Sequence, residues 1–233
     1  MNIIMAPFFT KKTIFSQHDS TLGQCGKDNF KVISRFYESV IKQNLKCVIF
    51  HNECSDEFVN KYQTNNIKFI YSDQQHRPSY NDERFYCYLD YLEKNTLIDN
   101  VFCTDIFDVE FYQNPFKILE KKTDLYVGSE SKKKSLKWLN IKFDQCKFPR
   151  LSPKEDYYNA GIVGGSREKI IEFLKVMILQ FNNIDKNINS NMPVFILSVK
   201  KMQKQGWKIF TGYPLHNEFK TNKNKELAYI KHK

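Results

Sequence analysis

The sequence contains no long run of apolar residues, and glycine, proline and tryptophan are few. Its 233 residues include 8 Gly, 7 Pro and 2 Trp, and no stretch approaches the roughly 18 consecutive apolar residues that a membrane-spanning helix requires. The first nine residues lack the basic region and the small-residue cleavage site of a secretory signal. We therefore expect a soluble, cytoplasmic protein with no transmembrane segment, not a secreted one.

Cysteine occurs six times, but no two cysteines have the Cys-x-x-Cys spacing. Without that spacing, a zinc cage and a disulfide framework are both disfavoured. We expect free thiols in a reducing compartment. The positions are Cys25, Cys47, Cys54, Cys87, Cys103 and Cys146.

Arginine is also scarce, although the chain is basic, with 36 Lys plus Arg against 26 Asp plus Glu and a formal net charge of +10. Arginine occurs only at Arg35, Arg77, Arg84, Arg150 and Arg167, so most of the positive charge is lysine. Bidentate hydrogen bonding to the edges of nucleic-acid bases relies mainly on arginine. Sequence-specific binding of nucleic acid is therefore disfavoured, whereas phosphate-bearing small molecules and anionic surfaces remain candidate partners.

Short apolar segments alternate with longer segments of helical periodicity, which is typical of an α/β domain with a parallel sheet covered by helices. Residues 129–153 read as a polar, Lys-rich stretch, and residues 157–165 as a sharp glycine-containing segment. Neither a repeat nor a linker is visible, so one domain over residues 1–233 is expected. The predicted strands are 3–9, 47–51, 67–72, 100–105, 125–129 and 207–210. The predicted helices are 29–43 and 192–205, with three more that begin near Ser55, Asn81 and Ser166.

The predicted strand 100–105 runs straight into two aspartates, Asp105 and Asp108. Ligands of α/β sheets bind beyond the carboxyl ends of the strands. Two neighbouring carboxylates repel each other unless a cation lies between them, and Mn²⁺ or Mg²⁺ suits such oxygen ligands. The alternative is a turn in which Asp108 caps the next segment.

His216 is the candidate third ligand, because it lies in a loop with Gly and Pro after the last predicted strand. Imidazole together with carboxylates suits Mn²⁺ better than Ca²⁺. The alternative is a solvated loop histidine. His18, His51, His76 and His232 have weaker contexts, and we expect His232 to fall in a frayed tail.

Six sequence blocks occur together in this chain: NDERFYCYLDY at 81–91, FCTDIFDV at 102–109, NPF at 114–116, LYVGSE at 125–130, NAGIVGG at 159–165 and TGYPLHNEFK at 211–220. In this order they resemble the GT-A glycosyltransferases, in particular a group of small single-domain nucleotide-sugar transferases of bacteria and large viruses. The likeness spans nearly the whole chain, although each block alone is weak. It implies a Rossmann-like GT-A fold with a mostly parallel sheet, a donor-binding part at about 1–130 and an acceptor-side part at about 131–220. A viral source would make the compartment the host cytoplasm.

The resemblance also implies a reaction, the transfer of a sugar from a nucleotide donor, a UDP-sugar in the leading hypothesis, to a hydroxyl of a glycan or glycoconjugate. Asp105 and Asp108 take the parts of the family's D-x-D motif, with one extra residue between them. By this analogy Asp105 approaches the ribose or sugar, Asp108 binds the metal, and His216 completes the metal shell. A metal there would offset the charge that develops on the departing nucleoside diphosphate.

Further donor contacts follow from the same resemblance. The strand tip at 7–10 would hold the nucleobase and ribose, with Phe8 or Phe9 as a stacking face and core packing as the alternative. Arg84 would border the donor pocket unless it forms a surface ion pair, and Lys220 would add a positive charge at the phosphates. The donor-binding candidates are Pro7, Phe8, Phe9, Thr10, Arg84, Asp105, Asn159, Gly161, His216 and Lys220.

On the acceptor side, the resemblance assigns Asn159 and Gly161 to a segment where small residues let the backbone approach the sugar. Related chains tend to begin the next helix with an acidic residue, and here Asn191 stands in that place. An amide cannot serve as a general base. Asp156 and Glu155 are the nearby carboxylates, with Asp156 the first candidate, and the stereochemistry stays open between inverting and retaining.

Two functions of other kinds remain as alternatives. A basic nucleic-acid-binding or nuclease module would use the same aspartates and the positive charge, but no helix-turn-helix, zinc-finger or RNP pattern is present. A GT-A domain that binds sugar nucleotide without turnover would fit the amide at Asn191. The Lys-rich stretch 131–137 and the tail are candidates for a weak contact with an anionic membrane, against the alternative of a solvated face.

Overall fold

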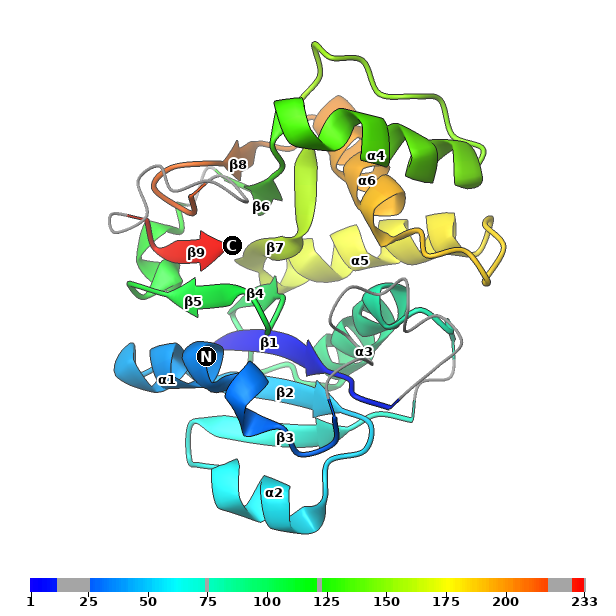
Figure 1. Cartoon of the computed structure of the whole chain (residues 1–233). Coiled ribbons are helices and arrows are strands. Elements are labelled where there is room, and N and C mark those ends of the chain that lie inside the picture. Colours follow the sequence, from blue (N-terminus) through cyan, green and yellow to red (C-terminus); the bar gives the residue numbers. More distant parts are fainter. Residues whose placement is uncertain (12–25, 74–75, 121–122, 218–227, 233) are drawn as a thin grey trace.

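The computed structural model describes residues 1–11, 26–73, 76–120, 123–217 and 228–232 of the chain (Figure 1). These residues form one α/β domain with a central sheet and helices on both of its faces. The helices are α1 (Ser34–Lys42), α2 (Asp56–Tyr62), α3 (Tyr80–Lys94), α4 (Lys132–Gln145), α5 (Arg167–Phe181) and α6 (Asn191–Lys204). The strands are β1 (Asn2–Phe8), β2 (Cys47–His51), β3 (Ile67–Tyr71), β4 (Asn100–Thr104), β5 (Val109–Phe111), β6 (Leu125–Ser129), β7 (Tyr158–Ser166), β8 (Ile209–Thr211) and β9 (Ile230–His232).

Seven strands form the central sheet in the order β3-β2-β1-β4-β7-β6-β8. All neighbours pair in parallel except β7, which is antiparallel to both β4 and β6. The predicted α/β class with a mostly parallel sheet is confirmed, and such a sheet is compatible with a Rossmann-like fold. The strands predicted at 47–51 and 125–129 have the observed bounds.

The two faces of the sheet have separate cores, because successive side chains of a strand point to opposite faces. In β1, Ile3 and Met5 pack with side chains of α3, α5 and α6. Ile4 and Ala6 pack on the other face with side chains of α1 and α2. Figure 1 shows α5 between α3 and α6 on one side of the sheet.

The glycine-containing segment expected at 157–165 is not a sharp turn but the long strand β7. Its glycines allow close packing instead of a tight turn. Gly164 lies opposite Phe102 of β4, and a side chain at Gly164 would overlap the Phe102 ring. The expected sharp segment was therefore wrong: the glycines are small so that a neighbouring strand can pack closely, and they do not interrupt the strand.

The helices confirm some predictions and correct one. Ser55 and Ser166 cap α2 and α5 as expected, each accepting a hydrogen bond from the backbone N–H three residues on. The Lys-rich stretch at 129–153 contains a helix that was not predicted, α4, which buries Leu139 and Phe143. None of the described helices combines the length and apolar character needed to cross a membrane.

Candidate metal centre

Asp105 and Asp108 lie at the carboxyl end of β4, in the loop that leads to β5. The order of the sheet reverses here, since β2 flanks β1 on one side and β4 flanks it on the other. Ligands of open α/β sheets bind in the crevice at such a reversal. The side chains of Asp105 and Asp108 are 29% and 36% exposed, so solvent reaches both carboxylates.

His232, not His216, lies against these two aspartates. Its Nε2 is 3.6 Å from Oδ2 of Asp105 and 3.6 Å from Oδ1 of Asp108. One ligand atom of each of the three residues lies within 4.8 Å of the others. Within the described ranges, this is the one group of three or more His, Cys, Asp or Glu side chains that has the spacing of a metal site.

Strand β9 positions His232, so the expectation of a frayed tail was wrong for this residue. β9 pairs antiparallel with β5, and His232 lies opposite Val109 in that pairing. Asn217 holds the same backbone from the other side. Its Oδ1 accepts the N–H of His232 at 2.8 Å, and its Nδ2 donates to the carbonyl of His232 at 3.0 Å. The local pattern at 230–232 is too short to reveal this long-range pairing.

His216 is buried, and main-chain groups hold its ring. Nε2 accepts a hydrogen bond from the N–H of Gly212 at 3.1 Å, and Nδ1 lies 2.6 Å from the carbonyl oxygen of Asn217. Burial lowers the pKa of His216 to about 4, so the ring is neutral at pH 7. His216, the predicted metal ligand, is not part of the group formed by Asp105, Asp108 and His232, but its neighbour Asn217 contacts His232. Lys220 lies outside the described residues, and its role stays a prediction.

Gly161 in β7 leaves the space in which Asp105 and His232 meet. A Cβ atom at this position would lie 2.5 Å from Oδ2 of Asp105 and 2.8 Å from Nε2 of His232. Both distances are too short for non-bonded atoms. The carbonyl of Gly161 also accepts the N–H of Asp105 at 2.9 Å. This glycine was expected beside the acceptor, and the structure places it against the candidate metal ligands.

Arg84 projects from α3, and its buried guanidinium forms an ion pair with the partly exposed carboxylate of Asp105. Its guanidinium also donates to the carbonyl of Ala160 at 3.2 Å. Only 2% of Arg84 is exposed, so the surface ion pair considered from the sequence is excluded. Burial lowers the pKa of Arg84 from its usual value, and neighbouring acidic groups that include Asp108 act in the opposite direction. One arginine opposite two carboxylates leaves one negative charge at the cluster when the histidine is neutral.

Asp82, which precedes Arg84 by two residues, serves a different network. Its carboxylate accepts hydrogen bonds from the N–H and Oγ of Ser190 at 3.1 and 3.0 Å, and it pairs with Arg77 at 3.3 Å. The carboxylate of Asp82 thus lies beside the first residues of α6, the helix that begins at Asn191. Because Asp82 is fully buried and bound on both sides, it is not placed to take a proton from a substrate.

The residues at the tip of β1 are more deeply buried than a stacking platform would be. Pro7, Phe8 and Phe9 all lie in the interior, and neither phenylalanine offers an exposed ring face. Thr10 donates its N–H to Oδ1 of Asn52 at 3.0 Å. Within the described part of the chain, Oγ1 of Thr10 and Nδ2 of Asn52 are buried without a hydrogen-bond partner. Asn52 was missed, although it directly follows a correctly predicted strand at the same edge.

Asn159 connects the backbone of β7 to a buried carboxylate. Its Nδ2 donates to Oε2 of Glu130 at 2.8 Å, and its Oδ1 accepts the N–H of Gly161 at 2.7 Å. These bonds fix the backbone beside the candidate metal ligands. Asp156, the candidate base, is exposed in the loop before β7, where its charge adds to the burial that raises the pKa of Tyr158.

Comparison with known proteins assigns no family to this chain: no protein-family model matches it, and no curated protein sequence matches it.

Proposed function

We propose that this protein is a metal-dependent glycosyltransferase that moves a sugar from a nucleotide-sugar donor, a UDP-sugar, to a hydroxyl of a glycan. The observation that carries the proposal is the convergence of Asp105, Asp108 and His232 at the carboxyl edge of the sheet. The six sequence blocks that resemble GT-A glycosyltransferases support the same reaction, and five of them lie wholly in the described residues.

The donor set of the cluster fits a divalent cation. Two carboxylates and one imidazole suit Mn²⁺, and Mg²⁺ is the harder alternative. Two of the three side chains come from the loop after β4 and the third from β9, and Gly161 keeps the space between Asp105 and His232 clear. Arg84 neutralises one carboxylate only, so a negative charge remains for a cation to balance.

The edge next to the cluster supports a nucleotide as the donor. The carboxyl ends of β1, β2 and β4 are neighbours in the sheet. Thr10 and Asn52 hold buried polar atoms there that a ribose or base could bind, and such atoms are costly when they stay unbound. A diphosphate attached to that nucleoside would extend toward the two aspartates, which is the arrangement that the proposal requires.

Bound to this cluster, the metal would supply positive charge that stabilises the departing diphosphate. The chain's own residues orient the ligands. Arg84 fixes one oxygen of Asp105 and leaves the other facing His232. Asn159 fixes the backbone of Gly161, which lies against Asp105 and His232, and Asn217 fixes the backbone of His232.

Release of UDP from a panel of UDP-sugars, with Mn²⁺ and a mixture of oligosaccharide acceptors, tests the proposal. We expect release with at least one donor, dependent on Mn²⁺ and absent in Asp108→Asn. Full release by that variant, or release that is indifferent to Mn²⁺, would refute the assignment.

A further inference from the structure

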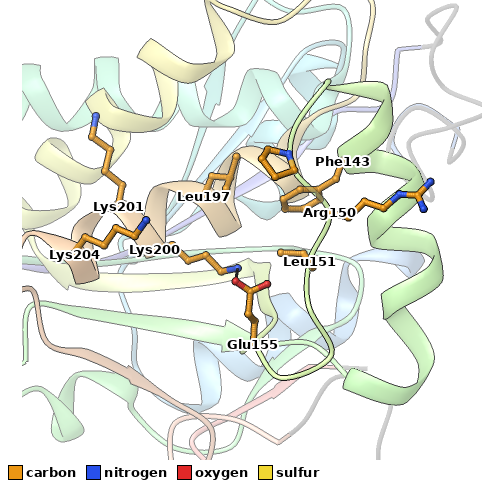
Figure 2. A pocket seen from close by; sticks show the side chains of 9 residues that line it. Phe143, Arg150, Leu151, Glu155, Leu197, Lys200, Lys201 and Lys204 are labelled. Carbon is orange, nitrogen blue, oxygen red and sulfur yellow. Dashed lines mark ion pairs between the residues drawn. The ribbon is translucent and has the colours of Figure 1, made fainter.

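A pocket of about 310 Å³ lies between the end of α4, the loop after it and α6 (Figure 2). None of the metal-cluster residues lines it. Its volume is at the lower end of the range for small-molecule sites. The lining residues are Phe143, Pro149, Arg150, Leu151, Glu155, Leu197, Lys200, Lys201 and Lys204.

The lining carries four cationic side chains and one carboxylate, so its formal charge is 4 − 1 = +3. Glu155 and Lys200 pair at 2.8 Å, and the bond from Lys200 lowers the pKa of Glu155. Arg150 pairs with Asp144, outside the pocket. Lys201 and Lys204 have no ion-pair partner in the part of the chain that the structure describes. When Asp144 is counted as well, the remaining charge is 3 − 1 = +2, and it belongs to these two lysines, on one turn of α6.

The pocket joins this charge to an apolar floor. Phe143 and Leu151 are buried beneath it, and Leu197 of α6 is half-buried beside them. A hydrogen bond holds the turn that forms the pocket rim at Glu155: Oε2 of Glu155 accepts the N–H of Ser152 at 2.7 Å. An anionic ligand with an apolar face would meet both kinds of surface.

The same chain segment connects the pocket rim to the metal cluster. Glu155 lines the pocket, and Asn159, four residues later, holds the backbone of Gly161. Gly161, which lies against Asp105 and His232, is six residues after Glu155, and six extended residues span at most about 21 Å. A sugar chain of several units is long enough to cover that distance.

We propose that this pocket binds an acidic saccharide, a sugar chain that carries carboxylate groups. The carboxylate lies near Lys201 and Lys204, and the apolar face of a sugar ring rests on the floor at Leu197. That the ligand is a saccharide rests on the proposed glycosyl transfer, in which such a chain would be the acceptor. That the ligand is an anion rests on the charge of the pocket alone.

Calorimetric titration of the full chain, without nucleotide or metal, tests the pocket directly. The probe is a hyaluronan tetrasaccharide, and maltotetraose is the neutral control of equal length. We expect only the acidic probe to bind, and more weakly at about 0.15 M salt than at low salt. In the double variant Lys201→Gln/Lys204→Gln, loss of two surface charge contacts should weaken binding about five-fold.

The matched control is Lys42→Gln/Lys68→Gln, which removes two exposed lysines on α1 and β3 and should leave binding unchanged. No binding of the acidic probe, equal binding of maltotetraose, or equal losses in the two double variants would overturn the inference. Inorganic phosphate that binds as tightly as the tetrasaccharide would also overturn it, in favour of a free-anion site. Mn²⁺-dependent UDP binding by the same preparation reports separately on the proposed function.

Discussion

His232 and Asp105 approach each other to 3.6 Å over the unsubstituted Cα of Gly161. The two side chains come from β9 and from the end of β4, which belong to different sheets. Their meeting depends on β5 pairing with β9 and on Asn217 holding the backbone of His232. The candidate metal centre is therefore a product of tertiary structure and not of one local motif.

Gly161→Ala should disrupt this centre more than the fold. The new methyl group would lie 2.5 Å from Oδ2 of Asp105, so that carboxylate or His232 must move. We expect Mn²⁺ affinity to fall about ten-fold or more, a size known for disturbed metal surroundings, as measured by Mn²⁺ titration of the folded protein. Gly164→Ala is the matched control, because its methyl group would meet Phe102 instead of the cluster. Equal Mn²⁺ affinity in wild type and Gly161→Ala would contradict the proposed ligand geometry.

Asp108→Asn should abolish transfer and leave stability nearly unchanged. Asp108 is 36% exposed, so its amide analogue costs little in folding, but it weakens the binding of a cation. We expect UDP release to fall about 100-fold or more, as when a main electrostatic contact to a reacting group is lost. The control is Asp90→Asn on α3, an exposed carboxylate in an i,i+4 pair with Lys94. A similar loss in both variants would show that the effect is not specific to the cluster.

His216 should make the protein less stable in acid. Its pKa is about 4 in the folded state against 6.5 in the unfolded chain. The stabilisation is therefore present above pH 6.5 and is lost as the pH falls from 6.5 toward 4, because the unfolded state takes up the proton first. The loss amounts to about 3 kcal/mol. Urea unfolding across this range should give a smaller pH dependence for His216→Gln than for wild type, and equal slopes would exclude this role.

Asp82→Asn should lower stability strongly, because it leaves the buried guanidinium of Arg77 without its carboxylate. Breaking a buried ion pair costs about 3–5 kcal/mol, which corresponds to a fall in Tm of about 10 °C for a chain of this size. Asp144→Asn is the control, since it breaks the exposed pair with Arg150 and should change Tm little. Equal Tm values for the two variants would mean that the buried network does not hold α6 to α3.

Six of the nine strands in the described residues and most of the helices could be predicted from local patterns, whereas β5, β7, β9 and the close contacts at the site could not. The observed β2 and β6 have the predicted bounds, because their apolar runs are compact and bounded by polar residues. The same reasoning failed at β7, where glycines serve packing against Phe102. It selected Asp105 and Asp108, which end a recognisable strand. It did not select His232, which lies beside both aspartates, because a three-residue pairing between distant segments leaves no local signal.

The most direct measurement is thermal unfolding with UDP, with and without Mn²⁺, in wild type and in His232→Ala. At a UDP concentration near 100 times Kd, binding should stabilise the wild type by about 2.7 kcal/mol, a rise in Tm of about 5–10 °C. The rise should require Mn²⁺ and should shrink in His232→Ala, and a DNA oligonucleotide should cause none. A UDP effect that is independent of both Mn²⁺ and His232, or stabilisation by the oligonucleotide alone, would contradict the proposed metal and donor site.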